Sequence, residues 1–338
     1  MEWIRPASRA VPSAIGLCIA GWRDILPIKR VTNRAGQINR ISLEKRYDPM
    51  SNLDDLDVYL FDLNGFLHLK QALSRAEVAE LNASLDEIPP LSPGEWHGYV
   101  HAHTYGTVDG LNLQQIYEAG APFEALIDHP SWFDRVKHFV GGEGTFDYAH
   151  GPLFIDENFA NFREPGEAIG LHSGGYPPIM RNGFRYHGGR FMCGQVNVLM
   201  ALTDIGPGDG ATMVIPGSHK SNFIHPEFAR HAMNPKGASV EGITGSAELC
   251  MEAGDALLFV DGISHGSATR RNAGTRRIVV YRYGPSWGNF RHGYRPSPDL
   301  LDRLTPERRQ IISPQHASPD GAPYGRPGRH VRHCHGGK

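Results

Sequence analysis

The hydrophobic pattern divides the chain into a helical first part and a β-rich second part. In the second part, short apolar runs alternate with turns rich in Gly, Pro and Asp, and no helical period separates them. The runs occupy residues 151–155, 195–204, 211–219, 256–262 and 277–284. Short strands at this spacing are typical of an antiparallel sandwich or barrel. The pattern therefore predicts a mainly β protein with flanking helices.

Helical signals are concentrated in the first part. Ser74 opens the sequence SRAE, a capping box, and apolar residues follow it at helical spacing. A second helical stretch spans residues 122–142 and is expected to break at Pro130. Residues 60–70 carry an Asn-Gly pair between apolar residues, which predicts a short β-like segment around a turn.

No internal repeat or long linker separates independent domains. We expect a lead-in over residues 1–50, one domain over residues 51–315 with a short helix near 305–312, and a flexible tail over 316–338. The tail holds His330, His333, Cys334 and His335. A disordered, His-rich end of this kind is expected to bind metal only adventitiously.

Composition excludes several classes of protein. The 338 residues carry a formal net charge of -2, which gives no general attraction to a nucleic acid polymer or an anionic membrane. The four cysteines are widely spaced, so neither a disulfide framework nor a structural zinc site is expected. The apolar run at residues 14–21 is too short to span a bilayer. These features predict a cytoplasmic enzyme or binding protein for small molecules.

Two histidines in the β region suggest a metal site. His172 follows a strand-like segment, and His265 lies at a strand end. Imidazole suits non-haem Fe(II), which keeps positions open for a cosubstrate and O2. Arg276, one strand further on, has the geometry to pair with the distal carboxylate of 2-oxoglutarate, and the Ser267 hydroxyl to add a hydrogen bond.

Gln195 and Asn197 alternate with apolar residues on one predicted strand. They either point into the barrel and hydrogen-bond 2-oxoglutarate or an iron-bound ligand, or are ordinary buried amides. The sequence does not distinguish these interpretations.

These segments resemble the phytanoyl-CoA dioxygenase-like family of Fe(II)/2-oxoglutarate enzymes. The resemblance rests on FDLNGFLHLKQALSRAEVAELNASLDEI at residues 61–88, on PGSHK at 216–220, and on the H-x10-R spacing from His265 to Arg276. It covers about residues 60–314. It implies a double-stranded β-helix, or jelly roll, and the cofactors Fe(II), 2-oxoglutarate and O2.

The chain departs from the family at the third iron ligand. The family motif is His-x-Asp or His-x-Glu, whereas this chain has His172-Ser173-Gly174. In members of the wider superfamily with Gly there, chloride takes the vacant position and the enzyme chlorinates an unactivated carbon. Gly174 therefore predicts a halogenase, with a biosynthetic role in making a halogenated metabolite.

Alternatives to this assignment remain open. His187-Gly188-Gly189 is a second His-x-Gly sequence and a rival for the first ligand. Alternatively, Asp156, Glu157 or Asp261 supplies a carboxylate, which would make the enzyme a hydroxylase. A further alternative is a non-catalytic relative that binds a metabolite. We expect His219 to be a structural turn residue rather than a ligand.

Basic and aromatic residues cluster around the segment that follows His172. We expect the substrate-binding residues to be Arg163, Tyr176, Arg181, Phe184, Tyr186 and Arg190. Arginine pairs well with phosphate and aromatic rings stack on bases. This composition predicts a small anionic substrate, such as a nucleoside monophosphate.

Overall fold

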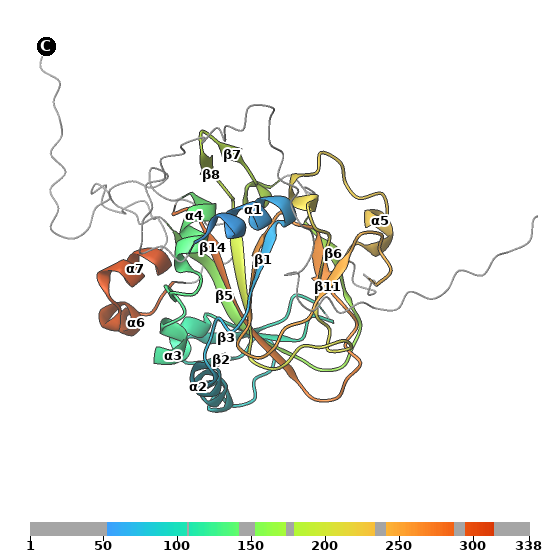
Figure 1. The fold of residues 1–338 in the computed structure, drawn as a ribbon. Helices are drawn as coiled ribbons and strands as arrows, with labels where there is room; N and C mark the ends of the chain where they lie inside the picture. The colour runs from blue at the N-terminus through green and yellow to red at the C-terminus, as the bar shows by residue number, and fades with distance from the viewer. Residues whose placement is uncertain are drawn as a thin grey trace, which may run out of the picture. The chain divides into compact units, whose positions relative to one another are not determined.

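Two antiparallel sheets form the framework of the protein (Figure 1). The computed structural model describes residues 53–106, 108–141, 153–173, 179–233, 241–286 and 295–313. Within these residues, the major sheet has the strand order β1-β12-β9-β14-β5-β4-β3-β2 and the minor sheet the order β11-β10-β13-β6, beside a small β7–β8 hairpin.

The strands in chain order are β1 Phe66–Leu69, β2 Trp96–His97, β3 Val100–His103, β4 Leu111–Gln114, β5 Phe154–Arg163, β6 Ile169–His172, β7 Tyr186–His187, β8 Arg190–Phe191, β9 Val196–Ala201, β10 Thr212–Val214, β11 Ala247–Leu249, β12 Ala256–Val260, β13 His265–Ser267 and β14 Arg276–Gly284. The α-helices are α1 Asp55–Asn64, α2 Arg75–Asp86, α3 Ala121–Glu124, α4 Phe133–Val140, α5 Phe228–His231, α6 Pro298–Arg303 and α7 Pro306–Ile312. Three 3-10 turns are η1 Ile116–Ala119, η2 Met180–Asn182 and η3 Ser218–Lys220.

Apart from the β7–β8 hairpin and the β10–β11 pair, which stays in the minor sheet, successive strands of the β region alternate between the two sheets. β5 lies in the major sheet and β6 in the minor one, and the chain then moves between the sheets through β9, β10, β12, β13 and β14. This alternation is the topology of a double-stranded β-helix. The predicted fold class is therefore confirmed, and the apolar runs of the sequence form the central strands.

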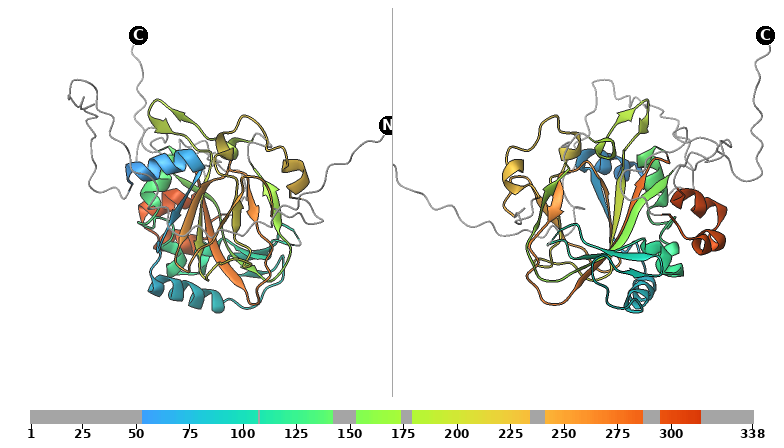
Figure 2. Two further views of the ribbon diagram at one scale, coloured as in Figure 1. Left: turned by 45° about the vertical axis from the view of Figure 1, so that its right-hand side comes forward. Right: turned by 180° about the vertical axis from the view of Figure 1, so that it is seen from behind.

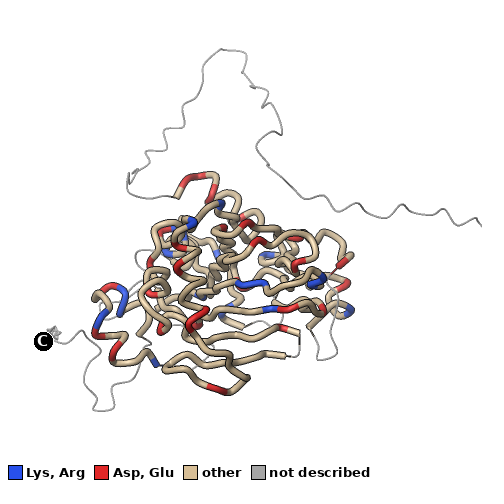
Figure 3. Tube along the Cα trace, turned by 90° about the horizontal axis from the view of Figure 1, so that it is seen from below, with Lys and Arg blue, Asp and Glu red and all other residues tan. Residues whose placement is uncertain are grey.

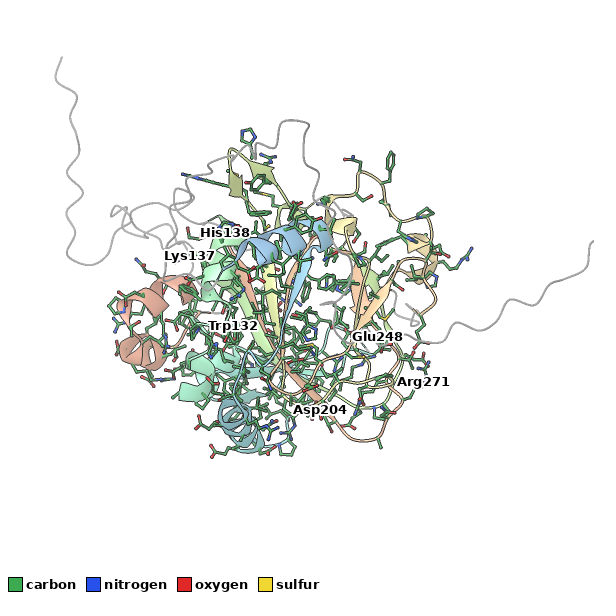
Figure 4. All side chains as sticks on the ribbon, viewed as in Figure 1. Trp132, Lys137, His138, Asp204, Glu248 and Arg271 are labelled. Carbon is green, nitrogen blue, oxygen red and sulfur yellow. The ribbon has the colours of Figure 1, made fainter. Side chains whose placement is uncertain are left out.

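Helices cover the outer face of the major sheet (Figure 2). Helix α4 packs against β14 and β9, and α7 packs against β5. Two buried tyrosines fix this layer: Tyr281 donates to the carbonyl of Phe123 over 2.6 Å, and Tyr283 donates to that of Leu126 over 3.0 Å. Trp132, which is fully buried just before α4, donates to the Tyr283 hydroxyl (Figure 4). Helices thus close this face, while the inner face lines a cavity.

The helix signals at Ser74 and Pro130 are confirmed. Ser74 and Glu77 form the predicted capping box at the start of α2. Helices α3 and α4 lie on either side of Pro130. The sequence thus located these helices through their caps and breaks.

The prediction for residues 60–70 is wrong in its first half. Residues up to Asn64 continue helix α1, and strand β1 begins only at Phe66. Gly65 adopts a left-handed conformation, φ 82°, and its N–H bonds to the carbonyl of Phe61, which ends the helix. The Asn-Gly pair is thus a helix C-cap rather than a hairpin turn.

The distribution of charged residues and the length of the helices can be compared with the expectations for nucleic acid and membrane binding. Acidic and basic residues are interspersed along the described trace (Figure 3). Among the described residues, every helix is too short or too polar to cross a bilayer. The predicted lead-in, the tail, Gly174 and Tyr176 lie outside the described residues.

Replacing Gly65 tests the contact between the α1 C-cap and the PGSH turn. A Cβ at this position would lie 2.4 Å from His219 Nδ1, whereas a Cβ at Gly98, which also has a positive φ, meets nothing within 4 Å. Both Ala variants carry backbone strain, but only Gly65→Ala adds a clash. We expect Gly65→Ala to lower the free energy of unfolding by about 1–3 kcal/mol more than Gly98→Ala, measured by urea denaturation. Equal losses of unfolding free energy in the two variants would show that His219 moves aside without destabilising the protein.

Candidate active site

Strands β6 and β13 bring His172 and His265 together. The two residues are Cα partners in the antiparallel register of these strands. Their ring centroids lie 4.0 Å apart. Two residues far apart in the sequence are therefore held side by side by backbone pairing, which leaves little freedom in their separation.

Each imidazole is oriented by a backbone carbonyl. His172 Nδ1 lies 3.1 Å from the carbonyl oxygen of Gly170, and His265 Nδ1 lies 2.8 Å from that of Ile263. When Nδ1 donates its hydrogen to these oxygens, the lone pair is on Nε2. Ring orientation by a hydrogen bond at the second nitrogen is the usual support of a metal-ligating histidine.

Burial keeps His265 uncharged. Desolvation, with the nearby charge of His172 as the second cause, holds the pKa of His265 well below its usual value. A neutral imidazole is the form that binds a metal. The histidine pair therefore fits a divalent metal such as Fe(II).

The chain turns sharply directly after His172. Ser173 has a φ of 62°, in the left-handed region that few residues other than glycine adopt. Backbone conformations of this kind gather at functional sites. Gly174, the predicted open ligand position, follows this turn but lies outside the described residues.

The two histidines share a cavity of about 590 Å³ with Ser267 and Arg276. Arg276 lies on β14, and Ser267 on β13 is the register partner of Thr212, which also lines the cavity. The fold therefore brings the predicted metal ligands and the predicted cosubstrate contacts to one cavity. The histidine pair and the Arg276 guanidinium line different parts of it.

Arg276 is buried and holds an unpaired donor. Its Nη1 donates to the carbonyl of Gly210 and its Nη2 to Asn161 Oδ1 over 3.0 Å, while Nε has no hydrogen-bond partner among the described residues. Burial and the nearby charges of Arg163 and Arg270 lower its pKa to about 9. An anionic carboxylate would satisfy both the donor and the charge, so this end of the cavity fits 2-oxoglutarate.

Gln195 and Asn197 do not line the cavity. Gln195 donates to Asp156 over 3.0 Å, and Asn197 donates to Asp261 Oδ1 over 3.1 Å. Both amides are buried. The structure thus places them as buried amides that hold carboxylates, and gives their proposed contact with cosubstrate no support.

Of the predicted substrate-binding residues that the structure describes, Arg181 lines the cavity. Phe184 packs against His219 and Phe191. Tyr186 and Arg190 are exposed on the β7–β8 hairpin, and neither lines the cavity. From Ile179 onward, the segment after His172 therefore contributes fewer cavity residues than its composition suggested, because Phe184 and Tyr186 pack against Phe191.

Arg163 is also absent from the cavity wall, because it lies buried beside Arg276. Its expected role at the substrate mouth is thus not supported by its position.

The rival histidines lie elsewhere. His187 is exposed on β7, outside the cavity. His219 is buried in η3, where its Nε2 lies 3.1 Å from the carbonyl oxygen of Asp62, and burial lowers its pKa to about 4. These positions favour His172 as the partner of His265 and fit a structural role for His219.

Three carboxylates were alternatives for a third ligand, and Asp261 is the one that lines the cavity. Asp156 and Glu157 line a separate small polar pocket. Among the described residues, no three His, Cys, Asp or Glu side chains are grouped so that they could hold a metal ion.

A charged wall of the cavity escaped the sequence analysis. Arg282 forms an ion pair with Glu157 over 3.0 Å and lies 3.8 Å from Asp261. Burial lowers its pKa, but the two carboxylates, Glu157 first, raise it more. The signal was present in the alternation of β14, since Arg276, Ile278, Val280 and Arg282 all line the cavity.

Comparison with known proteins identifies the family of the chain. The phytanoyl-CoA dioxygenase (PhyH) family matches residues 61–278, and the chain belongs to this family. By its description, this family is one of dioxygenases. The dioxygenase cdmD of Talaromyces verruculosus is 25% identical over 119 residues, a match that spans 35% of either chain.

Solved structures share the fold. HygX of Streptomyces hygroscopicus, with nickel and 2-oxoglutarate bound, superimposes with a TM-score of 0.56 at 23% identity, over 73% of this chain and 94% of that chain. HygX with nickel, 2-oxoglutarate and hygromycin B gives a TM-score of 0.54 at 22% identity, over 78% of this chain and 97% of that chain. This similarity establishes the double-stranded β-helix.

Loss of either histidine is expected to weaken metal binding strongly. We expect His172→Ala and His265→Ala to weaken Mn(II) binding on the order of 100-fold or more, measured by calorimetry, because each removes one of two protein ligands. His187→Ala is the matched control, since His187 lies outside the cavity, and should bind as the unaltered protein does. Loss of binding in the control instead would return His187 to the site.

Proposed function

We propose that this protein is an Fe(II)/2-oxoglutarate-dependent halogenase that chlorinates an unactivated carbon of a small molecule. The observation that carries the proposal is the pairing of His172 and His265 in a cavity that also contains Arg276, in a chain with Gly174 two residues after the first histidine. A biosynthetic role and a cytoplasmic location are part of the proposal.

The protein's own residues would bind and orient the reactants. His172 and His265 would hold the iron through Nε2, because Nδ1 of each ring faces a backbone carbonyl. Arg276 and Ser267 would hold the distal carboxylate of 2-oxoglutarate. Bound iron, with 2-oxoglutarate and O2, supplies the oxidising power that removes hydrogen from a substrate carbon.

Glycine at position 174 favours chloride over a protein carboxylate. A glycine offers no ligand atom, and chloride would restore the negative charge that Asp or Glu supplies in other members of the family. The oxygens of Asp261, which lines the cavity, are held by Arg181 over 2.9 Å and by Asn197 over 3.1 Å. Its engagement with these partners supports a role in the cavity wall rather than on the metal.

A hydroxylase is the second candidate. It is favoured by the position of Asp261, which lines the cavity and whose charge acts on the pKa of His265. If Asp261 turned from Arg181 to the metal, the site would have two imidazoles and a carboxylate, the ligand set of Fe(II) oxygenases. The fold and the histidine pair are the same in both candidates.

Absorption spectra with and without chloride separate these candidates. Fe(II) and 2-oxoglutarate are added without oxygen, and the metal-to-ligand charge-transfer band is recorded. We expect a band that shifts with chloride, and a Gly174→Asp variant whose band no longer responds, since a carboxylate would occupy the chloride position.

Asp261→Asn is the matched variant at the rival position. The halogenase proposal expects it to keep both the band and the chloride response. A band indifferent to chloride in the unaltered protein, together with weaker iron binding in Asp261→Asn, would instead identify a hydroxylase.

The substrate we propose is a small anionic molecule, such as a nucleoside monophosphate. Arg181 carries this proposal: its Nε pairs with Asp261, while its two terminal nitrogens have no hydrogen-bond partner among the described residues. A planar fork of this kind matches the oxygens of a phosphate or carboxylate. The wall formed by Leu171, Phe228 and Met233 would contact the less polar part of the substrate.

Arg181→Gln tests the anionic substrate. We expect AMP to bind the unaltered protein about tenfold more tightly than adenosine, measured by thermal shift, and Arg181→Gln to lose this difference because the charge is gone. Arg190→Gln is the control, since Arg190 is exposed outside the cavity. Equal binding of AMP and adenosine by the unaltered protein would refute the phosphate contact.

A further inference from the structure

Three buried arginines meet where β5 ends and β14 begins. Arg163 and Arg276 are Cα partners on these strands, and Arg270 donates from Nε to the carbonyl of Arg163 over 2.9 Å. All three are at most 4% exposed. Burying several like charges together destabilises a protein unless each charge has a partner. The partners of each arginine therefore indicate its role.

Arg270 is fully engaged within the protein. Its Nη1 lies 2.9 Å from Asp209 Oδ1, and its Nη2 donates to the carbonyl of Gly274 over 2.6 Å. Asp209 also accepts from Asn272 and from the N–H of Gly206. This ion pair is therefore complete in itself and accounts for one of the three positive charges.

Arg163 is only partly engaged. Its Nη2 donates to the carbonyls of Glu167 and of Ala268, the latter over 3.3 Å, while Nε and Nη1 have no hydrogen-bond partner among the described residues. Ala268 directly follows Ser267, which lines the cavity. Arg163 thus ties the end of β13 to the turn after β5 while keeping two unmatched donors.

Arg163 and Arg276 both lie close to the backbone of Gly210. The carbonyl of Gly210 accepts from Arg276, and a Cβ at Gly210 would lie 3.0 Å from Arg163 Nη1. A glycine is required here by this closeness and by its φ of 70°. The charge of Arg163 also acts on Arg276, whose pKa is lowered first by burial and then by Arg163.

Among the described residues, the carboxylate that forms an ion pair with a member of the cluster is Asp209, and it pairs with Arg270 rather than with Arg276. The charge of Asp109, which lines the cavity, acts on Arg163. Burial raises the pKa of Asp109, against the opposing effect of Arg163. The hydrogen bonds of Arg276 go to the carbonyl of Gly210 and to Asn161, so a carboxylate bound there would supply the counter-charge that its described partners lack.

We propose that Arg163 is a positioning residue for the cosubstrate: a second guanidinium behind Arg276 that strengthens binding of the distal carboxylate through its charge. The inference rests on the proposed binding of 2-oxoglutarate at Arg276. Arg163 also aligns this end of the cavity, since its bond to Ala268 holds the backbone next to Ser267.

Two substitutions separate the charge of Arg163 from its hydrogen bonds. Arg163→Gln keeps an N–H donor for the carbonyls but removes the charge, whereas Arg163→Lys keeps the charge and loses the planar fork. The dissociation constant of 2-oxoglutarate is measured by calorimetry on the Mn(II)-loaded proteins without oxygen. We expect Arg163→Gln to raise it about 10- to 100-fold and Arg163→Lys to remain within a few-fold of the unaltered protein.

The dissociation constant for Mn(II) itself should not change in either variant. A double Asp209→Asn, Arg270→Gln variant is the control, because it removes a neutral ion pair from the same cluster and should leave 2-oxoglutarate binding unchanged. If Arg163→Gln fails to fold, Arg163→Lys still tests the inference, since a large rise in its dissociation constant would contradict a role based on charge.

Arg276→Gln distinguishes a wrong cosubstrate site from a wrong role for Arg163. If this variant binds 2-oxoglutarate as tightly as the unaltered protein, the cosubstrate site itself is wrong. If Arg276→Gln loses binding while Arg163→Gln does not, the site stands and the role of Arg163 is overturned.

Discussion

The register between β6 and β13 is the constraint on which the site depends. It makes His172 and His265 direct partners, so the separation of their rings is set by backbone hydrogen bonds rather than by flexible side chains. A slip of one residue would turn every side chain of one strand to the opposite face. The pairing of β13 with β10 places Ser267 opposite Thr212 in the same cavity, so one short strand holds both a proposed metal ligand and a proposed contact to the cosubstrate.

The sequence predicted those parts of the fold that have strong local signals. The apolar runs became the central strands, and the capping box at Ser74 became the start of α2, because burial and capping act over a few residues. The Asn64-Gly65 pair was misassigned because a glycine with positive φ ends a helix as readily as it turns a hairpin. The pair ends a helix because α1 begins ten residues before Asn64, at a cap formed by Asp54. Asp54 was not recognised as a cap from the sequence.

The candidate site shows the same limit. The spacing from His265 to Arg276 named residues that share the cavity, because they lie where the chain crosses from β13 in the minor sheet to β14 in the major sheet. The roles of Gln195 and Phe184 could not be read in this way, because they depend on Asp156 and on His219, which lie on other elements. Arg282 was missed although the alternation along β14 contained it, since an arginine among apolar residues at a strand end reads as exposed until its carboxylate partners are known.

The cavity is built from two kinds of segment. Arg276, Asn161 and Ser267 stand on strands, whereas Arg181 and Phe228 stand on a 3-10 turn and on the short helix α5. Strand positions that face a packed interior tolerate little change, while connecting segments accept insertions and new residues. Descendants of such a protein can therefore exchange one substrate for another by altering the connections, while the part of the cavity formed by strands passes unchanged from one lineage to the next.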